Sequence, residues 1–320
     1  MNFLDIGQEK SIFADGIHDD TAAIQSCLDK MKNGGTIYFP DGTYLISAAL
    51  IFYSGQWLKF SDNARLLRSA KSENITKYML ASFSQPDVGG YDGTHDVVIS
   101  GGIFDGNREL TEKLTILNTV HCTNITVKNS RFVNGAMWHY IEFNSTKEIL
   151  VLDCVFDGLS YTAVREDLTS ELIQLDAPDV TTYGPVYDYK GSLIDFKKDK
   201  TPCTDAVIAS NIFKCNGFTA IGHHGNDEHT DIKILNNVFT GLSGNEKTSR
   251  GFITFMEKAH SIEVSENAFI STADEKQIAL GIRTKNPDNK SLLAHNNVFI
   301  GKFDEYFTGG ISEKNNSFQN

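Results

Sequence analysis

The 320-residue chain lacks any long hydrophobic run. No stretch reaches the roughly 18 apolar residues that a membrane-spanning helix requires, so we expect no membrane partner. Residues 1–15 contain Asp5, Glu9 and Lys10 and lack the basic and apolar regions of a secretory signal peptide. The compartment therefore stays open between the cytosol, a portion of a longer chain and export by another route.

Positive charge and paired cysteines are also scarce. Lys and Arg number 29 against 41 Asp and Glu, which gives a net charge of −12. Nucleic acid is not an expected partner, because its recognition requires basic patches. The five cysteines form no C-x-x-C pair, which argues against structural zinc and against a disulfide framework. Cys122 and Cys154 are expected to pack as small apolar side chains.

An Asn-x-Phe phrase recurs along the chain. The clear copies end in Phe213, Phe239, Phe269, Phe299 and Phe318, and looser copies without the Asn end in Phe104, Phe132 and Phe156. Successive phenylalanines are 19 to 30 residues apart, except for one step of 57. We interpret the long step as two coils, with an unseen copy in the segment 157–205.

This period predicts a solenoid, in which each repeat buries its apolar face on its neighbours. Asn at one position suits a ladder of stacked amides, and Phe two residues later would fill the interior. The predicted architecture is a single parallel β-helix domain over residues 1–320. A β-sandwich is less consistent, because its turns would recur about every 8–12 residues.

The first 50 residues predict an N-terminal cap and the first coil. Asp19 or Asp20 can cap a helix, and Ile24, Cys27, Leu28 and Met31 then give it one apolar stripe. Strands at 36–39 and 44–46 follow. Such a helix would cover the open end of the solenoid.

These segments carry a family resemblance. Asp15-Gly16-Ile17-His18-Asp19-Asp20-Thr21-Ala22-Ala23-Ile24-Gln25, followed by residues 34–44, resembles the N-terminal signature of the pectate-lyase-like superfamily, over about the first 70 residues. That group includes pectinases, epimerases and phage tailspike depolymerases. The resemblance implies an all-β fold, a right-handed parallel β-helix with an N-terminal capping helix.

The segment 177–204 is the main loop insertion. It contains Tyr183, Tyr187 and Tyr189. These rings could stack on sugars or could merely anchor the loop, and both interpretations stay open.

A second set of strands can be aligned by apolar residues expected to face inward: Ile141, Ile173, Ile221, Ile253 and Leu280. Alternation then predicts two outward columns. The first column is Glu142, Gln174, Gly222, Thr254 and Gly281, and the second is Asn144, Asp176, His224, Met256 and Arg283. Tyr140 and Leu172 would lie one step earlier on the same outward face.

Glu142 and Asp176 would lie one rung apart and two residues along, with Cα atoms about 8 Å apart. That spacing is compatible with the ~6.5–9.5 Å carboxyl separation of inverting glycosidases. Glu142 is the expected acid, because its neighbours Trp138 and Phe143 favour the protonated form, and Asp176 is the expected base. His224 could move protons, and Arg283 and Tyr140 could bind substrate.

The histidines allow other interpretations. Alternation turns His223 inward, as a core residue, unless a bulge after Gly222 exchanges it with His224. His229, Asp227 and Glu228 could hold a metal, but a purely structural role is favoured. We therefore expect no metal and no cofactor, although a lyase could use Ca²⁺.

Two further resemblances bear on the site. Glu171-Leu172-Ile173-Gln174-Leu175-Asp176 followed by Ile221-Gly222-His223-His224 is similar to a pattern in uncharacterised right-handed β-helix proteins. It implies Glu171, Gln174, Asp176 and His224 as site residues. Residues 281–285 resemble the Arg-Ile-Lys element of polygalacturonases, with Thr284 in place of Ile, but the paired Asp-Asp of that family is absent.

The sequence thus predicts a polysaccharide-degrading enzyme, with hydrolysis by Glu142, Asp176 and His224 and substrate contacts from Tyr140, Glu171, Gln174, His223 and Arg283. Lyase or C5-epimerase chemistry on uronic acids is the first alternative. The second is a glycan-binding or teichoic-acid-binding surface or phage tail protein without turnover. Action outside the cell or on a phage is expected, and a virion protein of this kind would form a homotrimer.

Overall fold

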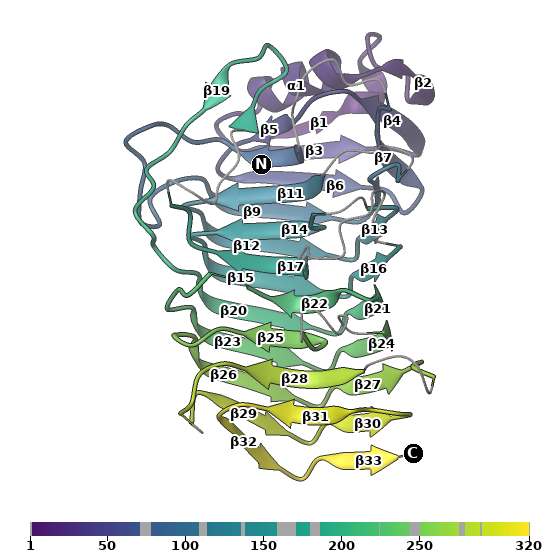
Figure 1. Cartoon of the computed structure of the whole chain (residues 1–320). Coiled ribbons are helices and arrows are strands. Elements are labelled where there is room, and N and C mark those ends of the chain that lie inside the picture. Colours follow the sequence, from purple (N-terminus) through teal and green to yellow (C-terminus); the bar gives the residue numbers. More distant parts are fainter. Residues whose placement is uncertain are drawn as a thin grey trace.

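The computed structural model is a stack of coils, each of which passes through three parallel sheets in turn (Figure 1). It describes residues 2–70, 78–108, 114–135, 138–158, 171–179, 186–223, 225–242, 250–274, 279–288 and 290–319. The parallel β-helix expected from the Asn-x-Phe repeat, and its right-handed form implied by the family resemblance, are thereby confirmed. No helix of this described part of the chain is both long and apolar enough to cross a membrane.

Each sheet runs the length of the stack. Sheet A contains β1 (Phe3–Asp5), β3 (Gly35–Phe39), β6 (Gln56–Phe60), β9 (His95–Ser100), β12 (Thr123–Lys128), β15 (Lys147–Leu152), β20 (Thr204–Ala209), β23 (Thr230–Leu235), β26 (His260–Ser265), β29 (Leu292–His295) and β32 (Ile311–Lys314). Sheet B contains β2 (Asp15–Asp19), β4 (Gly42–Ile46), β7 (Ala64–Arg68), β10 (Ile103–Asp105), β13 (Arg131–Val133), β16 (Val155–Asp157), β21 (Ile212–Asn216), β24 (Val238–Leu242), β27 (Ala268–Ser271), β30 (Val298–Ile300) and β33 (Ser317–Gln319). Sheet C contains β5 (Leu50–Phe52), β8 (Tyr78–Ser82), β11 (Thr115–Val120), β14 (Ile141–Asn144), β17 (Glu171–Asp176), β22 (Thr219–Gly222), β25 (Ile253–Phe255), β28 (Leu280–Thr284) and β31 (Glu305–Thr308).

The repeated phenylalanines form a stack inside sheet B. Phe156, Phe213, Phe239, Phe269 and Phe299 lie on successive rungs, with neighbouring ring centroids 4.7 to 4.9 Å apart. The spacing equals the distance between parallel strands, so each ring packs flat on the next. The prediction that Phe fills the interior is confirmed, since all five are fully buried.

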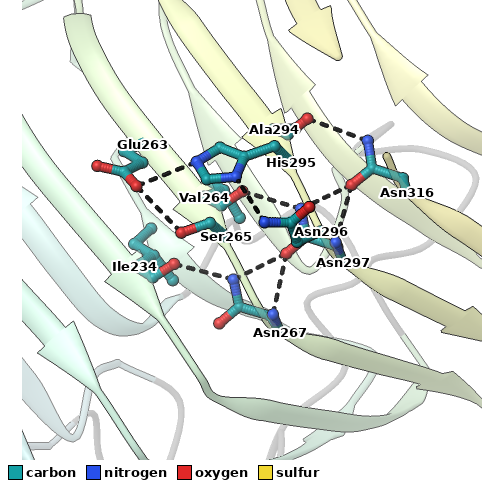
Figure 2. Close-up of polar contacts among 10 residues, drawn as sticks. All are labelled: Ile234, Glu263, Val264, Ser265, Asn267, Ala294, His295, Asn296, Asn297 and Asn316. Carbon is teal, nitrogen blue, oxygen red and sulfur yellow. Dashed lines mark hydrogen bonds and ion pairs between the residues drawn. The ribbon is translucent and has the colours of Figure 1, made fainter. Parts of the chain in front are cut away.

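The asparagines form the predicted ladder at the corner between sheets A and B (Figure 2). The backbone N–H of Asn267 donates to Oδ1 of Asn297 at 3.1 Å, and its side-chain amide donates to the same oxygen at 3.0 Å and to the carbonyl of Ile234 at 2.9 Å. The residue before each ladder Asn adopts a left-handed conformation, as at Asn236 (φ 53°) and Asn296 (φ 55°). Asn tolerates this conformation better than most residues, and it occupies the bend before three ladder positions, whereas Ser210 and Glu266 occupy the bend before Asn211 and Asn267.

A helix covers the N-terminal end of the stack, as predicted. It is α1 (Thr21–Lys30), preceded by a short 3₁₀ turn η1 (Ile6–Gln8), and Ile24, Cys27 and Leu28 are buried. Asp19 is the carboxylate that accepts the N–H of Thr21, at 3.0 Å. The neighbouring Asp20 instead accepts the N–H groups of Phe13 and Ala14 and so fastens the preceding loop.

The interpretation of the 57-residue step as two coils is wrong. β16 pairs directly with β21, and Phe156 lies opposite Phe213. The step is therefore one coil, lengthened by insertions on both sides of β17. The segment that follows β17 contains an antiparallel hairpin of β18 (Val186–Tyr187) and β19 (Leu193–Ile194).

We call residues 186–203 the strap. It begins at the first coils, beside β5, and runs back to β20 in the middle of the stack (Figure 1). At the first coils Val186 and Ile194 pack in a small apolar cluster with Ile51 and Ala81, on the outward side of sheet C. Tyr183 lies outside the described residues, so only Tyr187 and Tyr189 of the predicted stacking tyrosines can be placed, and both are half-buried on the strap.

Candidate functional site

Five polar side chains from three adjacent strands of sheet C form what we call the polar array: Asn118, Glu142, Asn144, Gln174 and Asp176. Glu142 lies opposite Asn118 on β11 and opposite Gln174 on β17. Asn144 lies opposite Asp176 in the same strand pair. The predicted register of Glu142, Gln174, Asn144 and Asp176 is therefore the observed one, near the middle of the stack (Figure 1).

The outward face of sheet C is nearly inaccessible to solvent at the polar array. Asn144 is fully buried and Asn118 is 1% exposed, whereas Glu142 and Asp176 keep 7% and 6% exposure. Gln174, which separates the two carboxylates, is 2% exposed. Solvent therefore reaches the array chiefly at its two acidic groups.

The hydrogen bonds of Glu142 come from its own face of the sheet. The hydroxyl of Thr115 donates to its Oε2 at 3.2 Å, and the amide of Asn144 donates to its Oε1 at 3.4 Å. Phe143 is fully buried in the core and points away from Glu142. Phe143 is therefore not an apolar neighbour of this carboxyl group, and the other predicted neighbour, Trp138, packs near Tyr78.

Asp176 lies where β17 enters the insertion. The backbone N–H of Ala177 donates to its Oδ1 at 2.8 Å, and the amide of Gln174 approaches its Oδ2 at 3.4 Å. Gln174 thus lies directly opposite Glu142 and contacts Asp176. It can orient the second carboxylate relative to the first.

The contacts of Glu171 indicate a structural role. It is fully buried and forms an ion pair with Arg250, and His139 lies beside it with Nδ1 3.7 Å from its Oε2. Arg250 also donates to the carbonyl of His223 at 3.1 Å. The expectation that Glu171 contacts substrate is not supported, because this carboxylate holds the coils together from within.

Tyr140 is placed in the core, so its predicted outward position is wrong. Its ring packs between Phe132 and Phe156, and its hydroxyl donates to the carbonyl of Asp157. Burial raises the pKa of this phenol well above its usual range. A buried, neutral Tyr140 supports the corner before β14 and has no surface with which to bind a sugar.

His223 points inward, as alternation predicts. It is fully buried, and its ring lies against His229, with centroids 4.6 Å apart, and against Phe255, at 5.6 Å. Substrate contact by His223 is therefore excluded in this arrangement. His224 lies outside the described residues, so its proposed proton-transfer role stays a prediction.

The strand of Arg283 is shifted from the predicted register. Ile253 lies opposite Ile282, not Leu280, and Arg283 lies opposite Thr254. Arg283 thus belongs to the column of Glu142 and Gln174, three rungs beyond Gln174. It forms an ion pair with Glu305 at 3.0 Å, and its contact with a substrate stays a prediction.

The structure adds Thr115 and Asn118, which the sequence did not single out. Both lie on β11, the strand before Glu142. Leu117 lies opposite Ile141 and could have revealed Asn118, because its alternation with Asn118 repeats that of Ile141 and Glu142. Thr115 has the parity of the inward-facing Leu117, so alternation would not have placed it on the outward face. Among the residues that the structure places, no three His, Cys, Asp or Glu side chains gather in a way that could hold a metal ion.

A family model described as rhamnogalacturonase A/epimerase, pectate lyase-like, matches residues 7–65. Residues 7–65 therefore match this family description, and the whole chain has the right-handed parallel β-helix fold.

Individual relatives differ in what they do. A curated relative, plasmin and fibronectin-binding protein A of Streptococcus pneumoniae, is 27% identical over 253 residues. The match covers 71% of this chain and 35% of the relative, so the chain spans about a third of that protein.

Two solved structures share the fold. PfbA, a surface adhesin of Streptococcus pneumoniae, superposes with a TM-score of 0.73 at 21% identity, over 100% of this chain and 80% of that one. A family 28 exopolygalacturonase of Yersinia enterocolitica gives a TM-score of 0.63 at 14% identity, over 100% of this chain and 66% of that one. The same scaffold therefore carries an adhesin and a hydrolase.

Proposed function

We propose that the protein binds a polysaccharide on the outward face of sheet C and hydrolyses it with Glu142 and Asp176. The observation that carries this proposal is the paired register of β14 and β17, which puts two solvent-reached carboxylates one rung apart and two residues along. Their Cα atoms are then about 8 Å apart, a spacing compatible with the ~6.5–9.5 Å separation of the carboxyl groups in inverting glycosidases.

In this mechanism Glu142 protonates the leaving glycosidic oxygen and Asp176 activates a water molecule on the opposite side of the sugar ring. The N–H donors of Ala177 and Gln174 suit Asp176 to the base role, because they hold it as an acceptor. Gln174 positions the base, and Thr115 and Asn144 position the acid.

Release of reducing ends from a panel of neutral and acidic glycans tests the proposal. Glu142→Gln and Asp176→Asn should each lower the rate by on the order of 10²–10⁴-fold, as expected for loss of a general acid or base. Glu313→Gln is the matched control, because Glu313 is an exposed carboxylate on β32, away from the array. Unchanged turnover in both array variants would refute the assignment, and an unsaturated product would indicate a lyase.

The second candidate is glycan or protein binding without turnover, at a cell surface or outside the cell. It is favoured by the near-closure of the array and by the similarity to a named binding protein over 71% of the chain. Binding on a glycan array by a protein that releases no product from any of the same glycans would support this second function and contradict the first.

A further inference from the structure

A hollow lies on a different face of the molecule from the polar array, over the outward side of sheet B. It has a volume of about 260 Å³. We call it the arginine pocket and define it by Arg65, Arg108, Arg131, Asn134, Asp157 and Gly158. These residues belong to four successive coils, since β7, β10, β13 and β16 are consecutive neighbours in the sheet. None of them belongs to the polar array.

Three guanidinium groups at one hollow are unexpected in a protein whose net charge is −12. Arg65 is neutralised by its ion pair with Asp105. Within the described ranges neither Arg108 nor Arg131 has a carboxylate partner. Asp157 already pairs with Lys214 at 2.8 Å. Two arginine charges are therefore left for an anion.

Asn134 and Gly158 surround the guanidinium group of Arg108. Asn134 accepts a hydrogen bond from Nη2 of Arg108 at 2.7 Å and donates to Oδ1 of Asp105 at 3.1 Å. Gly158 adopts φ +80°, and a Cβ atom there would lie 3.4 Å from Nη2 of Arg108. Glycine at this position both permits the left-handed turn and leaves space beside the guanidinium group.

The pocket lining indicates the kind of ligand. Guanidinium groups match carboxylates geometrically through paired N–H donors. Asp157 is an acceptor that would repel a bare oxyanion but can bind hydroxyl groups. Ile103 and Val133 provide an apolar floor for the C–H face of a ring. A molecule with a carboxylate, several hydroxyls and an apolar face is a carboxylated sugar.

We propose that the arginine pocket binds a carboxylate-bearing sugar residue of an acidic glycan. The carboxylate lies between Arg131 and Arg108, and ring hydroxyls donate to Asp157. The site is separate from the polar array, because it belongs to another sheet. It would hold an acidic chain against the side of the β-helix whether or not sheet C performs hydrolysis.

Calorimetric titration with sodium glucuronate at low ionic strength tests the proposal. Arg131→Gln and Arg108→Gln should each weaken binding at least about tenfold, as expected for loss of a charged hydrogen bond. Both side chains are exposed, so the fold should tolerate the changes. Lys233→Gln on sheet A changes the net charge equally at an exposed site and should bind as the unmodified protein does.

Three results would overturn the proposal. Binding of glucose as tight as that of glucuronate would exclude carboxylate recognition. Inorganic phosphate that binds equally well, with the same dependence on Arg131, would replace the sugar with a plain oxyanion. Loss of glucuronate binding in Glu142→Gln or Asp176→Asn, with Arg131→Gln unaffected, would move the sugar to sheet C. Glucuronate binding that depends on Arg131 in a protein without turnover would uphold this site and contradict only the hydrolase.

Discussion

At the scale of single residues, His229 should make folding sensitive to acid. Burial lowers the pKa of His229 from 6.5 to about 4. Its Nδ1 accepts the N–H of Cys203 at 2.9 Å, so the neutral ring carries its proton on Nε2. As the pH falls below 6.5, His229 becomes protonated in the unfolded chain. In the folded chain it stays neutral until about pH 4. The free energy of unfolding should therefore drop by about 3 kcal/mol across this window.

His229→Asn provides the test, because an Asn oxygen can replace Nδ1 as the acceptor without titrating. Urea unfolding followed from about pH 7.5 to about pH 4.5 should show a shallower loss of stability in this variant. His260→Asn, at an exposed position, should follow the unmodified protein. For Asp19 and Asp199, burial raises the pKa of the carboxyl group, but several hydrogen bonds together outweigh it and lower the pKa below its usual value. Parallel curves for His229→Asn and the unmodified protein would contradict the role of His229.

Alternation predicts the face on which a side chain lies only for residues inside strands. Glu142, Gln174 and His223 face the sides that parity assigns to them. Tyr140 has the same parity as Glu142, but it precedes β14 and lies at a corner, where the chain turns and alternation no longer applies. Arg283 illustrates another limit, because a two-residue slip keeps every side chain on its own face. Only the observed strand pairing distinguishes Leu280 from Ile282 as the partner of Ile253.

At the scale of elements, the Asn ladder should be strongest in its interior. Asn267 is almost fully buried and donates to Ile234 and Asn297, while its own oxygen accepts from both nitrogens of Asn237. Asn267→Ala leaves these buried partners unsatisfied, at a cost of about 1–3 kcal/mol for each group, so a total loss of roughly 3 kcal/mol or more is expected. Asn316→Ala, at the half-buried last rung, should cost clearly less. Equal losses in urea unfolding would show that the ladder does not act through burial.

The ladder also shows which elements a sequence can reveal. Each Asn and Phe is required by contacts with the same position one coil away, so the requirement repeats in the sequence. The 57-residue step misled because length alone does not distinguish an extra coil from an insertion. Ser130 and Cys154 occupy the ladder position in the coils before Asn211, and the N–H of Cys154 donates to Asn211 Oδ1 at 2.8 Å. The ladder therefore passes directly from Cys154 to Asn211, across the long step.

At the scale of the whole molecule, the strap joins coils that are far apart along the stack. It packs on β5 and β8 at one end and returns to sheet A at β20 (Figure 1). His121 fastens its middle, because Nδ1 lies 2.7 Å from the carbonyl of Gly90 and Nε2 lies 2.6 Å from the carbonyl of Lys197. Asp199 adds a bond from the N–H of Gly90 at 2.9 Å. The strap is thus held at several points beside the face that carries the polar array.

His121→Ala should release the strap while the stacked coils stay folded. Local opening then requires less free energy than global unfolding, so trypsin should cleave after Lys190 or Lys197 at least about tenfold faster. Both lysines are exposed on the strap, and mass spectrometry of the fragments identifies the cleaved bond. His260→Ala is the control, since His260 is exposed on sheet A. Cleavage spread evenly over the chain would mean that His121 stabilises the whole β-helix, whereas cleavage confined to residues 186–203 would show that the strap opens independently of the coils that carry Glu142 and Asp176.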